Sequence, residues 1–262
     1  MALPPPSPRG TAVITGASSG IGTALARALA SRGYGATLVA RDGDRLSRVA
    51  HELREFGVRV EAFEADLTSR TERRDLEARI GGTGLTVDIL VNAAGAATRG
   101  DFAECDLETE FGHLELNVVS VVDLCRTFAN DMLARGSGAI LNVASTAAFK
   151  PLTGQGTYAA AKAFVLSFTR TLRLELQETP LTVTALCPGP VPTEFAHRAG
   201  FGPEDIATIP RIMWKSADDV AAIAVDAMDR GVELCIPGRA NVADATMWLL
   251  KSKQQATQAA SR

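Results

Sequence analysis

The chain has 262 residues, of which 46% are hydrophobic and 22% charged, so it can bury the core of one large globular domain. Its net charge of −3 offers no basic footprint for nucleic acid, and no apolar run approaches the roughly 20 residues that span a bilayer. The four cysteines, Cys105, Cys125, Cys187 and Cys235, are widely spaced without a histidine cluster. This pattern favours reduced thiols in a cytoplasmic protein and predicts no metal site.

The chain opens with the proline-rich run M-A-L-P-P-P-S-P, which lacks the regions of a signal peptide. We therefore expect residues 1–9 to form an extended leader. Residues 10–250 contain no linker and no repeat, which predicts a single domain. Residues 251–262 are polar, and we expect them to form a frayed tail.

A glycine-rich turn follows the first predicted strand. The segment Thr15–Gly22 reads T-G-A-S-S-G-I-G, after an apolar run at 12–14 and before a helical pattern of apolar residues. In such a turn Gly16 allows the sharp bend, Gly20 allows a phosphate to approach the backbone, and Gly22 allows the helix to pack on the strand. The order strand, turn, helix favours nucleotide binding over a plain tight turn.

Strands and helices alternate along the rest of the chain. Apolar strand patterns occupy residues 36–40, 58–65, 87–91, 139–143, 181–186 and 232–236. Helical periodicity occupies residues 44–56, a stretch after 68, and the two long stretches 108–134 and 157–178. This alternation predicts an α/β protein with a doubly wound parallel sheet of about seven strands, covered by helices on both faces.

One group of residues has the composition of a proton-transfer site. Tyr158 and Lys162 are four residues apart on a predicted helix, so their side chains share a face. A nearby ammonium lowers the pKa of a phenol, which could then exchange a proton with a substrate oxygen. Ser145 follows the fifth strand, at the sheet edge where parallel sheets bind ligands. The alternative reading is a surface Tyr–Lys pair and a serine that caps a turn.

The chain resembles the short-chain dehydrogenase/reductase family, with its three-layer Rossmann fold. The matching segments are T-G-A-S-S-G-I-G at Thr15, Asp66-Leu67, N-A-A-G at Asn92, L-N-V-V-S around Asn117, Ser145, Y-A-A-A-K at Tyr158, and P-G-P-V-P-T at 188–193. They occur in the family's order over almost the whole chain. The resemblance implies transfer of a hydride between a nicotinamide cofactor and a carbonyl or secondary alcohol, without a metal.

The resemblance also implies a catalytic tetrad. Tyr158 would be the general acid in reduction, and Lys162 would lower its pKa and bind the nicotinamide ribose. Ser145 would hold the substrate carbonyl, and Asn117 would anchor a water that connects Lys162 to solvent. From the residues alone, Asn117 could equally be a satisfied core amide.

The implied cofactor contacts extend along the chain. Asp66 would contact the adenine, Asn92 and Gly95 would line the adenosine side, and the segment at 188–193 would meet the nicotinamide amide and the diphosphate. The full implied set is Gly16, Ser18, Ser19, Gly20, Ile21, Gly22, Arg41, Asp66, Leu67, Asn92, Ala93, Gly95, Tyr158, Lys162, Pro188, Gly189, Val191 and Thr193.

The end of the second strand favours NADP over NAD. An acidic residue there would bind the ribose 2′-hydroxyl of NAD, but the chain has Ala40 followed by Arg41. The Arg41 guanidinium can pair with a 2′-phosphate. Asp42 could neutralise that guanidinium or cap the next helix.

The segment after the sixth strand is expected to form a substrate flap at about 190–216. Its core, residues 194–214, carries Phe195, Phe201, Ile206, Ile209, Ile212, Met213 and Trp214. These side chains indicate a lipophilic pocket, or they simply pack the flap onto the domain. Together with the resemblance, such a pocket implies a lipophilic ketone or a 3-oxoacyl-type compound as the carbonyl substrate. The resemblance further implies a homodimer or homotetramer through the two long helices. The alternative function is a catalytically silent NADP-binding redox sensor or scaffold of the same fold.

Overall fold

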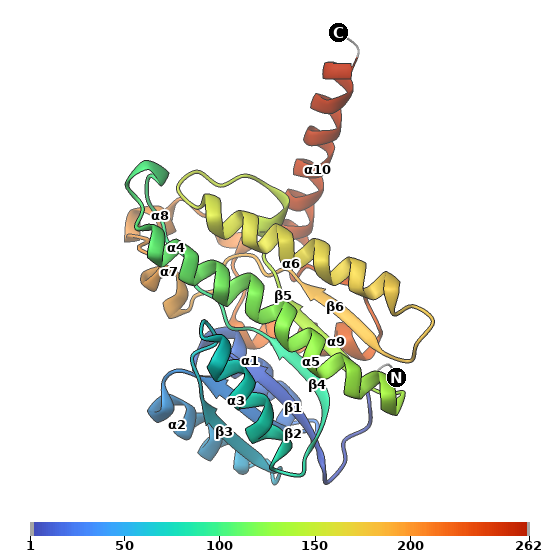
Figure 1. Cartoon of the computed structure of the whole chain (residues 1–262). Helices are drawn as coiled ribbons and strands as arrows, with labels where there is room; N and C mark the ends of the chain where they lie inside the picture. Colours follow the sequence, from blue (N-terminus) through green and yellow to red (C-terminus); the bar gives the residue numbers. More distant parts are fainter. Residues whose placement is uncertain (1–2, 261–262) are drawn as a thin grey trace.

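A single parallel sheet forms the centre of the molecule (Figure 1). The computed structural model describes residues 3–260, with side chains up to residue 254. The sheet has seven strands in the order β3-β2-β1-β4-β5-β6-β7, which confirms the predicted doubly wound arrangement. The strands are β1 (Gly10–Thr15), β2 (Gly35–Ala40), β3 (Val60–Glu64), β4 (Thr86–Asn92), β5 (Ala139–Val143), β6 (Thr182–Leu186) and β7 (Leu234–Cys235).

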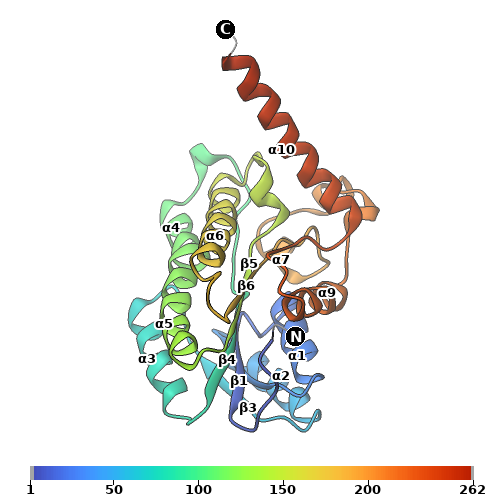
Figure 2. The same ribbon diagram turned by 90° about the vertical axis from the view of Figure 1, so that its right-hand side faces the viewer.

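Helices cover both faces of the sheet, as Figure 2 shows with the sheet nearly edge-on. One face carries α1 (Gly20–Ala30), α2 (Gly43–Arg54) and α9 (Ala217–Asp229). The other face carries α3 (Arg70–Gly81), α4 (Leu107–Leu114), α5 (Ser120–Arg135) and α6 (Gly156–Glu175). The inner strands are therefore buried on both sides, which explains their largely apolar sequences, whereas the edge strand β3 alternates between buried and exposed residues.

Neighbouring residues of one strand belong to two different cores. Ala12 and Ile14 of β1 pack with residues of α1 and α9, whereas Val13 packs with residues of α3 and α5. All three side chains are fully buried. Because successive side chains of a strand point to opposite faces, one short strand joins both helical layers.

The first of the two expected long helices, 108–134, is interrupted by a wider turn. Helix α4 passes into a π-helical turn at Glu115–Val119 and then into α5. A π turn admits one extra residue and shifts the backbone hydrogen bonds, and such turns often lie at functional sites. Asn117 sits in the middle of this one.

The C-terminal region differs from the expectation. Residues 251–260 are not frayed but continue α10 (Arg239–Ala260), which leads away from the body of the molecule in Figures 1 and 2. The segment is rich in alanine, glutamine and lysine and has no glycine or proline after Gly238, so its polarity is compatible with a helix. Residues 261–262 lie outside the described residues. No helix in the described part of the chain is long and apolar enough to cross a membrane.

The N-terminal segment lies against the domain from residue 3 onward. The Leu3 side chain is buried in the core beside α1, and the Tyr34 hydroxyl donates a hydrogen bond to the Pro4 carbonyl oxygen at 2.8 Å. Residues 1–2 of the expected leader lie outside the described part.

The strand order changes direction between β1 and β4, which are neighbours in the sheet although far apart in sequence. The loops that follow these two strands leave in opposite directions and open a crevice between them. This crevice lies at the carboxyl edge of the sheet, where the glycine turn follows β1 and the N-A-A-G segment follows β4.

Candidate active site

A cavity of about 970 Å³ occupies this edge of the sheet, from Arg41 at one end to Trp214 of the flap at the other. That volume is at the upper end of the usual range for ligand sites. Most of the residues expected from the sequence line it: Gly16, Ser18, Ser19, Gly20, Ile21, Gly22, Arg41, Leu67, Ala93, Gly95, Ser145, Tyr158, Lys162, Pro188, Gly189, Val191 and Thr193. Asp66, Asn92 and Asn117 do not line it.

The glycines of the first turn are required by its geometry. Gly16 and Gly20 have φ values of +66° and +57°, a region that residues with a Cβ rarely adopt. A Cβ on Gly22 would lie 2.2 Å from the Gly16 carbonyl oxygen. The turn is closed by the Thr23 hydroxyl, which donates to the Ala17 carbonyl oxygen at 2.7 Å. This geometry leaves the N-terminus of α1 bare toward the cavity, as an anion site requires.

Arg41 lies at the far end of the cavity, and no hydrogen bond or ion pair ties it to another described residue. Asp42 is occupied elsewhere, because its carboxylate accepts from the Arg45 backbone amide at 2.9 Å and caps α2. It also lies 3.2 Å from the Arg45 guanidinium. Of the two roles that the sequence left open for Asp42, capping of the next helix is therefore the one found. Arg41 remains available to an anion.

Two of the residues that the resemblance placed in the cofactor site stand behind the cavity wall. The Asp66 carboxylate accepts from the amide and hydroxyl of Thr68, at 3.0 and 2.9 Å, and shapes the loop that presents Leu67. Asn92 is buried at the end of β4 and donates to the side-chain oxygen of Asn142 on β5 at 2.8 Å. Both side chains act on the site through the segments that they support.

Asn117 is fully buried in the π turn and faces the N-A-A-G segment. Its amide nitrogen donates to the Ala96 carbonyl oxygen at 2.8 Å, and its Oδ1 atom has no protein partner. A Cβ on Gly95 would lie 2.9 Å from that oxygen and 3.3 Å from the Lys162 ammonium. The three residues thus meet in one place, and the unpaired Oδ1 is an acceptor suited to hold a water molecule.

Ser145, Tyr158 and Lys162 line the central part of the cavity. Ser145 stands at the end of β5, whereas the other two lie one turn apart near the start of α6. The Lys162 ammonium donates to the Val143 carbonyl oxygen at 2.9 Å and lies 5.8 Å from the centre of the Tyr158 ring. The Tyr158 ring in turn contacts Phe195 of the flap, with ring centres 5.6 Å apart.

The pKa values of the tyrosine and the lysine shift in opposite directions. Burial raises the pKa of the Tyr158 phenol to about 12, against the opposing effect of its hydrogen bond with Ser145. Burial lowers the pKa of Lys162 to about 8. The Lys162 ammonium lies over the Tyr158 ring and donates to Val143, and an effect of this ammonium on the pKa of Tyr158 stays a prediction.

The P-G-P segment forms the wall opposite the glycine turn. The Thr193 methyl group approaches Gly20, since a Cβ there would lie 3.2 Å from it. The Thr193 hydroxyl accepts from the Phe195 amide at 3.3 Å and caps α7 (Glu194–Arg198), the first helix of the flap. On the other side of this wall, the buried Asn241 amide packs so closely on Gly189 that a Cβ would lie 2.4 Å from it.

The flap covers the substrate end of the cavity with α7, α8 (Pro203–Ala207) and a short turn at Arg211–Met213. Six of its large apolar side chains line the cavity: Phe195, Phe201, Ile206, Ile209, Met213 and Trp214. The seventh, Ile212, points away and is 77% exposed. Most of the apolar residues of the flap therefore line the cavity, as a lipophilic pocket requires.

Ion pairs fasten the flap and α10 to the body around this end. Arg99, in the loop after β4, pairs with Asp205 of α8 at 2.6 Å, and Arg45 of α2 pairs with Glu194 of α7 at 2.5 Å. Lys150, in the loop after β5, pairs with Asp244 of α10 at 2.5 Å. Sequence reasoning missed these residues, because each pair joins segments more than 90 residues apart and carries no local pattern.

His113 was also missed. It lies on α4 one turn before Asn117 and lines the cavity. Burial, together with the nearby charge of Arg41, lowers the pKa of His113 against the opposing effect of Glu110. No local motif marks this position in the sequence.

Comparison with known proteins agrees with this architecture. A family model described as short chain dehydrogenase matches residues 10–201. A Streptomyces violaceoruber protein, named for a ketoacyl reductase of the granaticin polyketide synthase, is 38% identical over 199 residues, covering 75% of this chain and 73% of the relative.

Two solved structures match nearly the whole chain. The short-chain dehydrogenase from Sphingobium yanoikuyae in complex with NADPH is 36% identical, with a TM-score of 0.83 and 95% coverage of both chains. The bulky-bulky ketone specific alcohol dehydrogenase from Comamonas testosteroni is 30% identical, with a TM-score of 0.78 and coverage of 96% of this chain and 95% of that one. The match to the family model and these likenesses over most of the chain show that this protein belongs to the short-chain dehydrogenase family of oxidoreductases.

Proposed function

We propose that this protein uses NADPH to reduce a lipophilic ketone or 3-oxoacyl compound to the alcohol. The observation that carries the proposal is the arrangement of one cavity. Arg41, which has no hydrogen-bond or ion-pair partner among the described residues, stands at one end. Ser145, Tyr158 and Lys162 line the middle, and the apolar side chains of the flap close the other end. A relative named for a ketoacyl reductase and a ketone-specific alcohol dehydrogenase of similar structure support the same substrate class.

The residues of the cavity fit the cofactor. The positive φ values of Gly16 and Gly20 and the bare N-terminus of α1 suit the diphosphate, and Arg41 suits the 2′-phosphate. Asn92 would support the adenosine side from behind Ala93 and Gly95, and Pro188, Gly189, Val191 and Thr193 would face the nicotinamide end. When bound, NADPH supplies the hydride that goes to the carbonyl carbon.

The side chains of the protein supply the proton and hold the substrate. The Ser145 hydroxyl donates to the carbonyl oxygen, and the Tyr158 hydroxyl gives that oxygen its proton. A phenol whose pKa is raised to about 12 is fully protonated at neutral pH, which is the state that a proton donor needs. Lys162 would bind the nicotinamide ribose, and Asn117 would hold a water molecule on its unpaired oxygen.

Steady-state assays test the proposal. The purified protein is given NADPH and a panel of aliphatic, aromatic and acyl-thioester ketones, and loss of the reduced nicotinamide absorbance is followed. We expect turnover with at least one bulky apolar ketone and a higher kcat/KM with NADPH than with NADH. If NADPH binds in calorimetry but none of the ketones is reduced, the silent sensor or scaffold is the better description.

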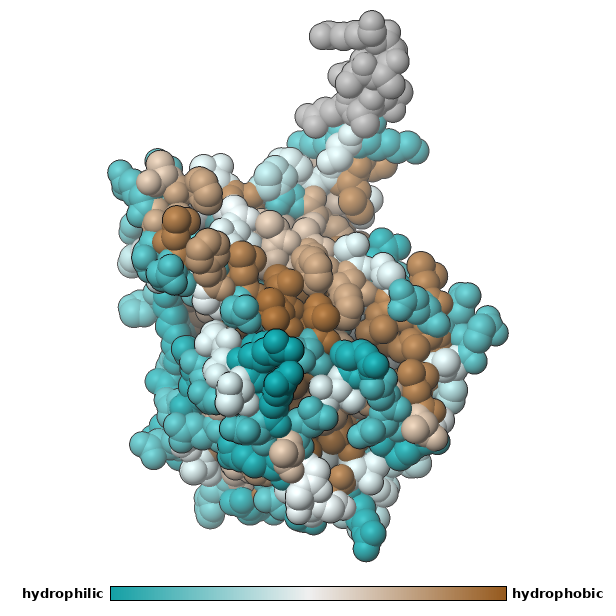
Figure 3. Space-filling model, in the orientation of Figure 1, coloured by the Kyte–Doolittle hydropathy of each residue, from teal (hydrophilic) through white to brown (hydrophobic). Residues whose placement is uncertain are grey.

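We also propose that the protein pairs with a second copy of itself, as a homodimer or homotetramer, through the α4–α5 and α6 surface. Apolar side chains gather over the α4 and α6 part of this surface in Figure 3, above a hydrophilic area that covers much of α5 and α3. Phe111 and Phe164 are 55% and 44% exposed there. Light scattering of the wild type and of Phe164→Glu checks this, and a wild type that is monomeric at assay concentration would contradict it.

A further inference from the structure

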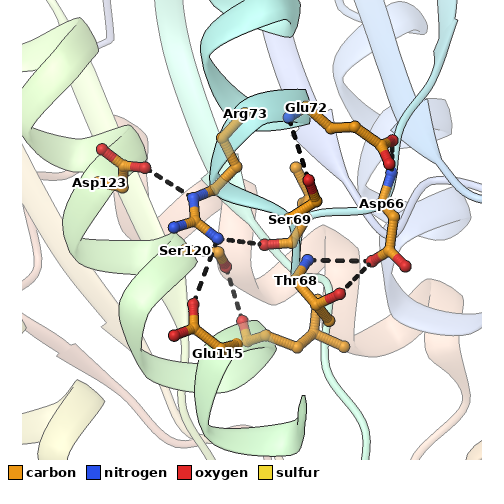
Figure 4. A network of polar contacts seen from close by, with 10 residues as sticks. Asp66, Thr68, Ser69, Glu72, Arg73, Glu115, Ser120 and Asp123 are labelled. Atoms are coloured by element: carbon orange, nitrogen blue, oxygen red, sulfur yellow. Dashed lines mark hydrogen bonds and ion pairs between the residues drawn. The ribbon is translucent and has the colours of Figure 1, made fainter.

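Arg73 of α3 is a buried cation that the proposed reaction does not use. Its side chain is 4% exposed, although arginine is rarely buried without a specific partner. Its Nε atom donates to the Asp123 carboxylate of α5 at 2.6 Å, and its Nη1 atom donates to the Leu67 carbonyl oxygen at 2.7 Å. The same nitrogen lies 3.4 Å from the Glu115 carboxylate. One guanidinium of α3 therefore contacts two other segments, the loop before α3 and the continuous stretch of the π turn and α5 (Figure 4).

The first of these segments is the loop between β3 and α3. Its polar groups are bonded almost entirely to one another and to the first turn of α3, as Figure 4 shows. The Asp66 amide donates to the Glu72 carboxylate at 2.6 Å, and the Glu72 amide donates to the Ser69 hydroxyl at 3.3 Å. The loop and the start of α3 thus form one unit, and Leu67 of that unit lines the cavity.

The second segment is the π turn that begins at Glu115. Leu116, the next residue, also lines the cavity, and its carbonyl oxygen accepts from the Ser120 hydroxyl at 2.6 Å. Asn117 follows directly. Because Asp123 lies on α5, which continues this turn, the Arg73 guanidinium contacts the turn region on both sides.

We propose that Arg73 is a positioning residue for the nucleotide, holding the Leu67 loop and the π turn at a fixed separation on the adenosine side of the cavity. The inference rests on the proposed use of NADPH. Asp123 and Glu115 are about 40–45% exposed, so solvent could satisfy both carboxylates without Arg73. The main effect of burying the guanidinium between them is therefore to fix the positions of the Leu67 loop and the π turn.

Binding of the adenosine half alone tests this. 2′,5′-ADP carries the adenine and the 2′-phosphate without the nicotinamide. Calorimetry with Arg73→Met should show binding of 2′,5′-ADP and of NADPH weakened by the same factor, roughly ten- to hundredfold for a displaced supporting residue. The KM for NADPH should rise with it, while the KM for the ketone keeps its value. Arg73→Lys, which retains the charge and can reach one acceptor, should recover part of the loss.

The control is Arg79→Met on the same helix. Arg79 lies over the Phe63 ring and donates to the Glu64 carbonyl oxygen, but it does not line the cavity, so 2′,5′-ADP binding should not change. If Arg73→Met does not fold, Asp123→Asn takes its place and should weaken 2′,5′-ADP binding in the same direction. Unchanged binding of 2′,5′-ADP to whichever of the two folds would overturn the inference. A wild type that does not bind 2′,5′-ADP at all would instead overturn the proposed use of NADPH.

Discussion

At the scale of single residues, the proton donor is the first point to test. Tyr158→Phe removes the hydroxyl but keeps the ring that contacts Phe195. General acid catalysis contributes about a hundred- to ten-thousandfold, so kcat should fall by that order while the Kd for NADPH stays nearly constant. The matched control is Tyr34→Phe, which loses only the hydrogen bond to Pro4 outside the cavity. A Tyr158→Phe variant that retained most of its kcat would exclude this residue as the donor.

Arg41 carries the prediction on cofactor choice. Arg41→Ile removes a guanidinium that makes no hydrogen bond or ion pair within the described part of the chain, so the fold should not change. A hydrogen bond to a charged group contributes about 1.5–3 kcal/mol, which corresponds to roughly a ten- to hundredfold loss of kcat/KM for NADPH. The kcat/KM for NADH should hardly change. The matched control is Arg48→Ile, since Arg48 is an exposed arginine of α2 outside the cavity. Measuring both variants at fixed ionic strength separates the specific effect from a general change in charge.

If Arg41→Ile leaves the ratio of the two kcat/KM values unchanged, another cation reads the 2′-phosphate.

At the scale of elements, the glycine turn makes a prediction about stability. In Gly22→Ala the new Cβ would lie 2.2 Å from the Gly16 carbonyl oxygen, so α1 must move away from β1. Such overpacking costs about 1–3 kcal/mol, and each kcal/mol lowers Tm by roughly 2–4 °C in a domain of this size. NADPH binding should weaken in parallel. Gly81→Ala on α3 is the control, since no atom lies within 4 Å of its Cβ position. A Gly22→Ala variant with wild-type Tm would contradict the packing argument.

The elements that the sequence predicts well are those whose signal is local. The strands and the helices that cover them have short periodic patterns, and the glycine turn has its own spacing. The π turn could not be predicted, because the Asn117 amide that supports it is bonded to Ala96, 21 residues away. The order of the helical residues gives no sign of that bond. The C-terminal extension of α10 was not predicted, because polar residues are common both in frayed tails and in exposed helices.

The residues of the candidate site divide in the same way, into those marked by a short sequence motif and those placed only by contacts between distant segments. Gly16, Ser145, Tyr158 and Lys162 lie in short motifs, and the structure brings them to one cavity. Asp66 and Asn92 lie in motifs too, but their side chains turn away from the cavity to support its walls. Arg73 has no motif, since its partners Glu115 and Asp123 are 42 and 50 residues away. Only the folded arrangement shows its role.

At the scale of the whole molecule, the flap is joined to the body by ion pairs from opposite sides of the cavity. The Arg99–Asp205 pair is the more enclosed of the two that reach the flap helices, because the Asp205 side chain is only 18% exposed. Asp205 also accepts from the Gly202 amide at 3.0 Å, and Arg99 lies over the Phe201 ring at 5.4 Å from its centre. A change at Asp205 therefore affects both the attachment of the flap and the start of α8.

Asp205→Ala should loosen the flap without disturbing the cofactor end of the cavity. The loss of about 0.5–1.5 kcal/mol for each hydrogen bond corresponds to a rise in the KM for the ketone of roughly two- to tenfold. The flap should also be cut faster in limited proteolysis, with the new cleavage sites between residues 194 and 214. The Kd for NADPH should keep its wild-type value. Glu233→Ala is the control, because it breaks the exposed Arg170–Glu233 pair away from the cavity and should change none of these quantities. If Asp205→Ala shows wild-type proteolysis and an unchanged KM for the ketone, the flap is held by its apolar contacts with the cavity wall and not by this ion pair.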